Sequence, residues 1–330
     1  MAFDKSKENF QDDFLIEPMM GLMHSYDPLN RLTALESGNL HSDSTVIFIP
    51  GLGDGFSAVP YLNKLALSLE EIQFSLTQIL LSSSYNGFGF SSLDNDIIEL
   101  KKCLRYLRKI GKKRFVLLGH STGCQDIIKY FNSFHQASDP INYQIIGAIL
   151  QAPVSDREYI IETLGHQNHQ LSINAAKKLI ESHSANAPIP SEFSDMFSGG
   201  KCTISASRWL SLAESLTVHP NGEDYFSSDL PTELLTNTLS GVGRAGTPAM
   251  VLISGSDETM PESVDKDSFL QNLVNALTQS NRPNQEWLRS ICQTWSAVLP
   301  KASHCAEEAE DELCDRIINF IQASLNNLQA

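Results

Sequence analysis

The sequence has few cysteines for its length, and none of them is arranged for a metal site or a disulfide framework. Six cysteines occur in 330 residues, and no two of them form a C-x-x-C pair. Their spacing matches no zinc-binding pattern, and their density is far below that of small disulfide-stabilised domains. We therefore expect free thiols in a reducing compartment, and no metal site.

Long hydrophobic segments and an excess of basic residues are also missing. No stretch reaches the roughly 18 apolar residues of a membrane-spanning helix, and no apolar segment follows a basic start as in a secretory signal. Lysine and arginine number 24 against 39 aspartates and glutamates, a net charge of −15. This balance argues against nucleic acid and anionic membranes as partners. We expect a soluble, cytoplasmic protein, monomeric or weakly dimeric, that acts on a small molecule.

Short, continuously apolar runs alternate with amphipathic segments along most of the chain. Such runs favour strands that are covered on both faces, and they occur at 45–50, 74–81, 114–119, 145–150, 249–254 and 296–299. Apolar residues at helical spacing predict helices over 61–71, 93–110, 124–134, 266–278 and 306–328. Two weaker strands are expected over 14–23 and 32–36. The alternation predicts an α/β fold with a doubly wound, mostly parallel sheet.

The alternation stops after residue 154 and resumes at residue 246. Residues 155–245 contain helical stretches at 175–183 and 205–215 between segments rich in Pro, Ser and Gly, without a convincing strand. Open α/β sheets place their sites at the carboxyl ends of the strands. We therefore expect 1–154 and 246–330 to form the core and 155–245 a helical lid over that edge. Aromatic side chains of this lid are candidates either for lining a substrate pocket or for holding the lid together, among them Phe197, Trp209 and Tyr225.

Residues 119–123 (GHSTG) match the G-x-S-x-G pattern of a nucleophile elbow. The pattern alone is common, but here a buried strand is predicted to end at residue 119 and a helix to begin just after Ser121. This setting exposes the serine Oγ and directs helix N–H groups toward a developing oxyanion. We predict Ser121 as the nucleophile and the backbone N–H of Thr122 as one oxyanion donor. The glycine-rich loop at 51–55 follows another strand, and it makes the N–H of Leu52 the candidate second donor.

A serine triad needs an acid and a histidine later in the chain, in loops that follow late strands. Asp257 follows the strand predicted at 249–254, and His304 follows the strand predicted at 296–299. We predict His304 as the general base and Asp257 as the acid that orients it, with Glu258 as the rival acid. Ser121 would attack an ester carbonyl and form an acyl-enzyme that water then releases. This chemistry requires no metal and no organic cofactor.

The chain resembles the α/β-hydrolase superfamily over nearly its whole length. Within it, four segments are similar to fungal and protist hydrolases that include the fungal siderophore esterases: GLGDG at 51–55, YNGFG at 85–89, GHSTGCQD at 119–126 and SGSDE at 254–258. The resemblance implies a cytoplasmic ester hydrolase with the triad Ser121, Asp257 and His304, and fusarinine-type hydroxamate siderophores as candidate substrates. Pro50 departs from the superfamily, because many members have histidine before the oxyanion glycine, and this leaves the second oxyanion donor open.

Two other interpretations fit the same residues. One is a peptidase or thioesterase that uses the same triad. The other is a catalytically idle α/β-hydrolase scaffold that acts as a ligand receptor, and an intact triad argues against it. A fluorophosphonate probe, which labels only an activated serine, separates an active hydrolase from the idle scaffold. The acyl and alcohol specificity depend on the lid, and periodicity does not predict them.

Overall fold

One eight-stranded sheet organises the computed structural model, which describes residues 18–133, 144–200, 202–280 and 282–328. The strand order is β1-β2-β4-β3-β5-β6-β7-β8. The pairs β1–β2 and β2–β4 are antiparallel, and all the other neighbours run parallel. The strands are β1 (Gly21–Asp27), β2 (Leu32–Gly38), β3 (Ser44–Ile49), β4 (Ser75–Ile79), β5 (Arg114–His120), β6 (Gln144–Gln151), β7 (Ala249–Ser254) and β8 (Ala297–Leu299). The predicted α/β-hydrolase sheet is confirmed.

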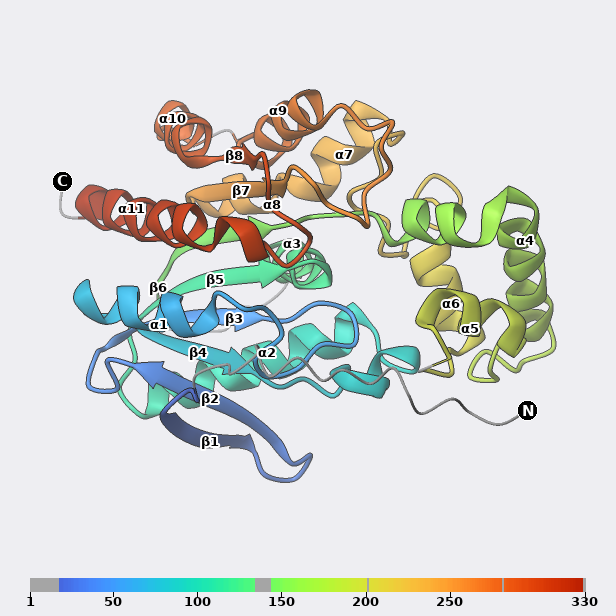
Figure 1. Ribbon diagram of the computed structural model, residues 1–330, viewed down its shortest axis with the longest axis horizontal. Coiled ribbons are helices and arrows are strands. Elements are labelled where there is room, and N and C mark those ends of the chain that lie inside the picture. The colour runs from blue at the N-terminus through green and yellow to red at the C-terminus, as the bar shows by residue number, and fades with distance from the viewer. Residues whose placement is uncertain (1–17, 134–143, 201, 281, 329–330) are drawn as a thin grey trace, which may run out of the picture.

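Helices cover both faces of this sheet (Figure 1), which explains why the central strands are apolar throughout. Every residue of β3, β4 and β7 is buried, whereas the edge strand β1 is largely exposed. One face carries α1 (Leu62–Glu71) and α11 (Glu310–Leu328), with α10 (Gln285–Trp295) beside them. The other face carries α2 (Leu93–Lys109), α3 (Thr122–Ser133), α7 (Thr232–Leu239), α8 (Gly241–Ala245) and α9 (Lys266–Leu277).

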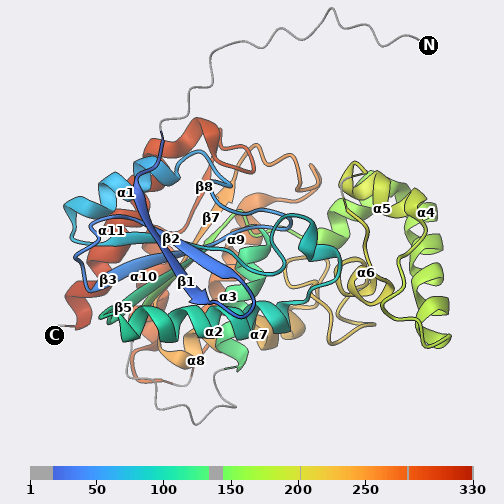
Figure 2. The ribbon, with the colours of Figure 1, turned by 90° about the horizontal axis from the view of Figure 1, so that it is seen from below.

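Three helices stand to one side of the sheet, as Figures 1 and 2 both show. They are α4 (Asp156–Glu181), α5 (Ser191–Ser198) and α6 (Ala206–Ala213), and we call them the cap. The cap has its own apolar cluster, which includes Ile160, Ile204 and Trp209. By contrast, α7 and α8 contribute Leu235, Leu239 and Val242 to the core under the sheet. Of the segment 155–245, only the cap stands apart from the sheet, and the lid role expected for this segment stays a prediction.

Two buried ion pairs link the cap to the loop that follows it. Arg208 of α6 pairs with Glu223, whose carboxylate also accepts the backbone N–H of Leu93 at the start of α2. Arg157 of α4 donates from Nε to Asp224 over 2.8 Å. Removal of either partner would leave a buried charge without its counter-ion, which is strongly destabilising. These pairs therefore hold the cap in place relative to the sheet edge.

The expected elements differ from the structure in several places, and within 155–245 the helices α5, α7 and α8 were not expected individually. The first strand is Gly21–Asp27 and not 14–23, of which 14–17 lie outside the described residues. Helix α4 begins 19 residues earlier than expected from 175–183, and non-helical backbone at Gly165, with φ of +76°, interrupts it, so that no continuous periodic pattern runs along it. Helix α10 was not expected at all. It buries only Leu288, Ile291 and Cys292, a pattern too short to stand out in a polar sequence.

Candidate active site

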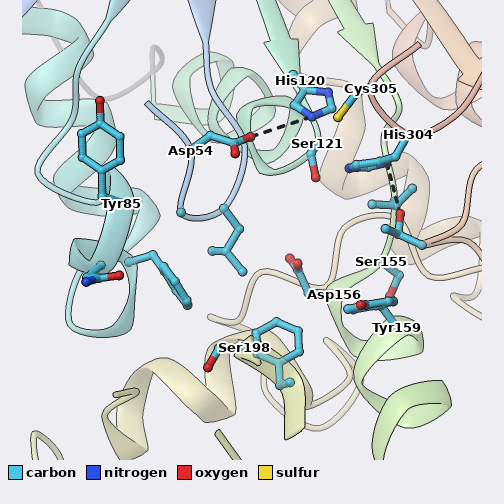
Figure 3. Close-up of a pocket in the computed structure, with 17 residues that line it drawn as sticks. Asp54, Tyr85, His120, Ser121, Ser155, Asp156, Tyr159, Ser198, His304 and Cys305 are labelled. Carbon is cyan, nitrogen blue, oxygen red and sulfur yellow. Dashed lines mark hydrogen bonds and ion pairs between the residues drawn. The ribbon is translucent and has the colours of Figure 1, made fainter. Parts of the chain in front are cut away.

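A cavity of about 490 Å³ lies between the carboxyl edge of the parallel strands and the cap (Figure 3). Loops that follow β3, β4, β5, β6, β7 and β8 all contribute to its wall, and α4 and α5 of the cap close the opposite side. Ser121 and His304 both line it. The structure therefore brings the predicted nucleophile and the predicted base, which are far apart in sequence, to one concave site at the edge where α/β folds bind ligands.

The predicted elbow is present, and two glycines permit it. Ser121 has φ of +52°, the left-handed region that a non-glycine residue rarely adopts. A Cβ on Gly119 would lie 2.3 Å from the carbonyl oxygen of Gly123, and a Cβ on Gly123 would lie 2.2 Å from that of Ile49. Any larger residue at either position would push the helix away from the strands. The turn is closed by hydrogen bonds from Ser121 N to Gln151 O and from Cys124 N to Ser121 O.

His304 and Asp257 form a hydrogen-bonded pair next to this turn. Asp257 is buried, and its two carboxylate oxygens lie 3.0 and 3.1 Å from His304 Nδ1. The same carboxylate accepts the backbone N–H and the hydroxyl of Thr259 at 2.9 and 2.7 Å. Glu258 instead accepts the backbone N–H of His304 over 2.9 Å. Asp257 is therefore the acid that faces the imidazole, whereas Glu258 holds the backbone of the loop and acts on the imidazole only through its charge.

The charges of this pair stabilise each other. Burial lowers the pKa of His304, but the hydrogen bond and charge of Asp257 outweigh it, so that the net shift is upward. Burial raises the pKa of Asp257, yet its hydrogen bonds to His304 and Thr259 bring the net value below its usual range. Ser121 Oγ makes no hydrogen bond to His304 among the described side chains. This contact is often long in an unliganded enzyme, and it tightens when substrate binds.

The raised pKa of His304 gives a prediction for the pH dependence of turnover. A general base must be neutral, so kcat/KM should fall as pH drops through a midpoint above the ordinary histidine value of 6.5. The measurement is kcat/KM for a neutral aryl ester between pH 5 and 9. In an Asp257→Asn variant, the residual activity should have its acid limb at lower pH, because the largest of the groups that raise the pKa of His304 is gone, while the smaller contributions of Glu258 and Asp54 remain. An unchanged limb in that variant would contradict the assignment.

The loop after β3 lies directly beside the elbow. A Cβ on Gly51 would come within 3.0 Å of Ser121 Cβ, and Leu52 lines the cavity. The side chain of Asp54 folds back to accept the N–H of Gly51 over 3.2 Å, which fixes the shape of the loop. The N–H groups of Leu52 and Thr122 remain the predicted oxyanion donors.

Sequence patterns did not reveal a buried network behind the histidine. Gln151, at the end of β6, donates from Nε2 to the carbonyl of His304 over 3.1 Å. Its Oε1 contacts Tyr61 Oη at 3.2 Å and His120 Nδ1 at 2.6 Å. This network holds the His304 loop against the sheet. The signal was weak, because one glutamine at the end of an apolar strand forms no motif.

The three aromatic side chains predicted for the lid do not act together. Phe197 lines the cavity and packs edge-on against Tyr159 and Trp209, with ring centroids 6.0 and 5.8 Å away. Trp209 is fully buried inside the cap, where its indole N–H donates to Ser172. Tyr225 is buried in the core cluster under the sheet. Neither Trp209 nor Tyr225 lines the cavity, because Trp209 packs inside the apolar cluster of the cap and Tyr225 inside the core of the sheet.

The described ranges contain neither a metal-binding cluster nor a membrane-spanning helix. No group of three or more His, Cys, Asp or Glu side chains there is arranged to hold a metal ion. No helix in the same ranges is long and apolar enough to cross a bilayer. All six cysteines are free thiols, as expected from their spacing.

The fold and the site together define a class of protein. An eight-stranded, mostly parallel sheet with a strained serine after β5 is the arrangement of the α/β-hydrolases. Solved structures agree on the fold. The chain is similar to "Siderophore hydrolase EstB from Aspergillus fumigatus", with a TM-score of 0.75 and 27% sequence identity over 94% of this chain and 98% of that one. This protein is a carboxylic ester hydrolase of the α/β-hydrolase class.

The family follows from the sequence comparisons. Residues 14–322 match the family described as "protein of unknown function (DUF1749)", and the chain belongs to that family. It is 31% identical to "Esterase AN6793" of Emericella nidulans, over 92% of this chain and 93% of the relative. It is 29% identical to "Fusarinine C esterase sidJ" of Aspergillus fumigatus, over 92% of this chain and 96% of the relative. The predicted family resemblance is confirmed.

Proposed function

We propose that this protein hydrolyses esters through an acyl-enzyme formed on Ser121, with His304 as general base and Asp257 as its orienting acid. The observation that carries the proposal is the His304–Asp257 pair, with Nδ1 and Oδ2 3.0 Å apart, beside a strained serine in one cavity. In this arrangement the Asp257 contact keeps the imidazole proton on Nδ1. Nε2 is then free to take the proton from Ser121.

The reaction then has two halves that share the same groups. Ser121 Oγ attacks the ester carbonyl as His304 accepts its proton, and the N–H groups of Leu52 and Thr122 would receive the oxyanion. His304 returns that proton to the leaving alcohol, which departs and leaves the acyl group on Ser121. Water enters, loses a proton to His304 and attacks the acyl carbonyl, which frees the acid and restores the serine.

The proposed substrate class is the ester of a hydroxamate siderophore. Two relatives that cover most of this chain carry names that include fusarinine C esterase and siderophore hydrolase. The cavity of about 490 Å³ has room for part of a bulky, flexible ester. The free thiols of the chain are typical of a reducing compartment, and they therefore favour a substrate that is processed in the cytoplasm.

Direct hydrolysis of purified siderophores tests this substrate class. The assay would follow release of monomeric hydroxamate from iron-free and iron-loaded fusarinine-type esters by mass spectrometry, with p-nitrophenyl butyrate as a small reference ester. The proposal requires cleavage of at least one siderophore ester by the wild type and none by Ser121→Ala. Cleavage of p-nitrophenyl butyrate without any siderophore ester would leave the esterase standing and remove the substrate. Absence of both turnover and fluorophosphonate labelling would favour the idle receptor.

The different positions of Phe197 and Trp209 give a prediction about the cap. Phe197→Ala opens the cavity wall, so the ratio of kcat/KM between a bulky and a small ester should change by about ten-fold, or about 1.4 kcal/mol. Trp209→Ala removes a fully buried side chain, so it should lower the free energy of unfolding by about 3–5 kcal/mol. Its losses should be similar on both esters. Thermal unfolding and kinetics on the two esters separate the effects, and equal losses with Phe197→Ala would show that its ring only supports the cap.

A further inference from the structure

The cavity contains a group of polar atoms that the triad does not use. They belong to Asp54 in the loop after β3, His120 at the end of β5 and Asp156 at the start of α4, and all three residues line the cavity. Figure 3 shows the Asp54 carboxylate directed at the imidazole of His120 and the carboxylate of Asp156 directed into the cavity. No lysine or arginine lines the cavity within the ranges that the structure describes.

The network behind His304 fixes where His120 carries its proton. Gln151 Nε2 donates to the carbonyl of His304, so the other atom of that amide, Oε1, must be an acceptor. Oε1 lies 2.6 Å from His120 Nδ1, which is therefore the protonated nitrogen. Burial, followed by the charge of His304, lowers the pKa of His120 to about 3, so the ring is neutral. His120 Nε2 is thus a hydrogen-bond acceptor.

This acceptor has no donor within the described residues. The buried His120 directs Nε2 at Asp54 Oδ2, 3.9 Å away, and a carboxylate oxygen is also an acceptor. Two acceptors that face each other across this distance require a hydrogen-bond donor between them. Asp54 Oδ2 receives one N–H, from Gly51, and the carboxylate retains further lone pairs. Water can supply this donor in the unliganded cavity, and a ligand that enters beside Ser121 can replace it with a donor of its own.

The negative charge of the cavity favours a positively charged ligand. Two carboxylates share the cavity with the aromatic rings of Phe88, Tyr159 and Phe197, and aromatic faces attract cations. Asp156 keeps one hydrogen bond, to its Oδ2 from Gln125 Nε2 at 2.9 Å. Burial raises the pKa of Asp54, and it raises that of Asp156 to about 7. A positive ligand would offset this cost of burying negative charge, whereas an anionic ligand would increase it.

We propose that Asp54, Asp156 and Nε2 of His120 form a subsite that selects ester substrates carrying a protonated amine. In this inference, which rests on the proposed function, the ammonium group donates to His120 Nε2 and Asp54 while the ester carbonyl lies at Ser121. Asp156 faces the same space from the cap side and adds the second negative charge. The three residues bind and select substrate, and the chemical step remains with the triad.

Three matched esters test this inference with the wild-type chain. The p-nitrophenyl esters of 6-aminohexanoate, 6-hydroxyhexanoate and heptanoate have the same length and end in an ammonium, a hydroxyl and a methyl group. At pH 8 an alkylammonium, with a pKa near 10.4, stays charged, and the carboxyl of Asp156 is ionised. We expect kcat/KM to fall in the order ammonium, hydroxyl, methyl, with about a ten-fold span between the first and the last. Equal values, or a preference for the methyl ester, would overturn the proposal.

Charge-neutral variants locate the effect. Asp156→Asn and Asp54→Asn keep the size of each side chain and an oxygen that accepts the Gln125 and Gly51 bonds. Each should lower the ammonium-to-methyl ratio of kcat/KM several-fold, and this ratio cancels any change in turnover that the two esters share. Asp195→Asn is the matched control, because Asp195 is an exposed carboxylate of α5 outside the cavity. A similar loss of the ratio in this control, or an unchanged ratio in both cavity variants, would show that no local subsite exists.

Inhibition separates this inference from the proposed function. Hexylammonium should inhibit hydrolysis of p-nitrophenyl butyrate competitively and at lower concentration than hexan-1-ol, whichever side of an ester carries the amine. Asp156→Asn should remove most of this difference. If the two inhibitors are equal while Ser121→Ala still abolishes turnover, the subsite fails and the serine esterase stands. If Ser121→Ala retains hydrolysis, the proposed function fails on its own.

Discussion

Ser121→Ala should abolish ester hydrolysis, with a loss in kcat of about 10⁴–10⁶-fold, because the hydroxyl that would form the acyl-enzyme is lost. Alanine removes only the hydroxyl. The strained backbone at φ of +52° is no worse for alanine than for serine, so the free energy of unfolding should hardly change. The measurement is single-turnover and steady-state kinetics on p-nitrophenyl butyrate, together with thermal unfolding of the same preparation.

The matched control for this variant is another serine of the same cavity. Ser198 lines the cavity from α5, and its hydroxyl donates to the carbonyl of Ser194, with no histidine or carboxylate partner. Ser198→Ala should therefore keep activity within a few-fold of wild type and should still be labelled by a fluorophosphonate. Retention of more than a few per cent of activity by pure Ser121→Ala would exclude Ser121 as the nucleophile.

Asp257→Asn should have the second largest effect, a loss in kcat of about 10⁴-fold. The amide that replaces the carboxylate can offer an N–H to His304 Nδ1. This favours the imidazole tautomer with its proton on Nε2, which cannot accept the proton of Ser121. The carboxylate that stabilises the imidazolium is lost as well. The measurement is kcat of the variant and the wild type across pH 6–9. A defect that comes from the wrong imidazole tautomer should persist at every pH in this range.

Glu258→Gln distinguishes this role from that of the neighbouring acid. Glu258 accepts the backbone N–H of His304, and the amide oxygen of glutamine can accept the same bond. We expect activity within a few-fold of wild type. A severe loss with Glu258→Gln combined with a mild loss with Asp257→Asn would reverse the assignment of the triad acid.

The sequence by itself predicted most strands of the central sheet and the loops in which Ser121, Asp257 and His304 lie. Runs such as 45–50, 114–119 and 249–254 are apolar without alternation, and this pattern, in segments this short, favours strands covered on both faces. The elbow followed from the same signal, because a G-x-S-x-G pattern at the end of such a strand has one structural solution. Asp257 and His304 could be placed because parallel strands bring their following loops to one edge.

Tertiary structure alone decided which partners those groups meet. Asp257 and Glu258 are adjacent in sequence, and only the path of the loop turns one toward the imidazole and the other toward the backbone of His304. Phe197 and Trp209 are both aromatic residues of the cap, and burial against Ser172 separates the inner one from the cavity wall. The proton on His120 depends on an amide from another strand. Local patterns encode secondary structure and periodicity, whereas these contacts join segments distant in sequence, whose positions are set by packing of the whole chain.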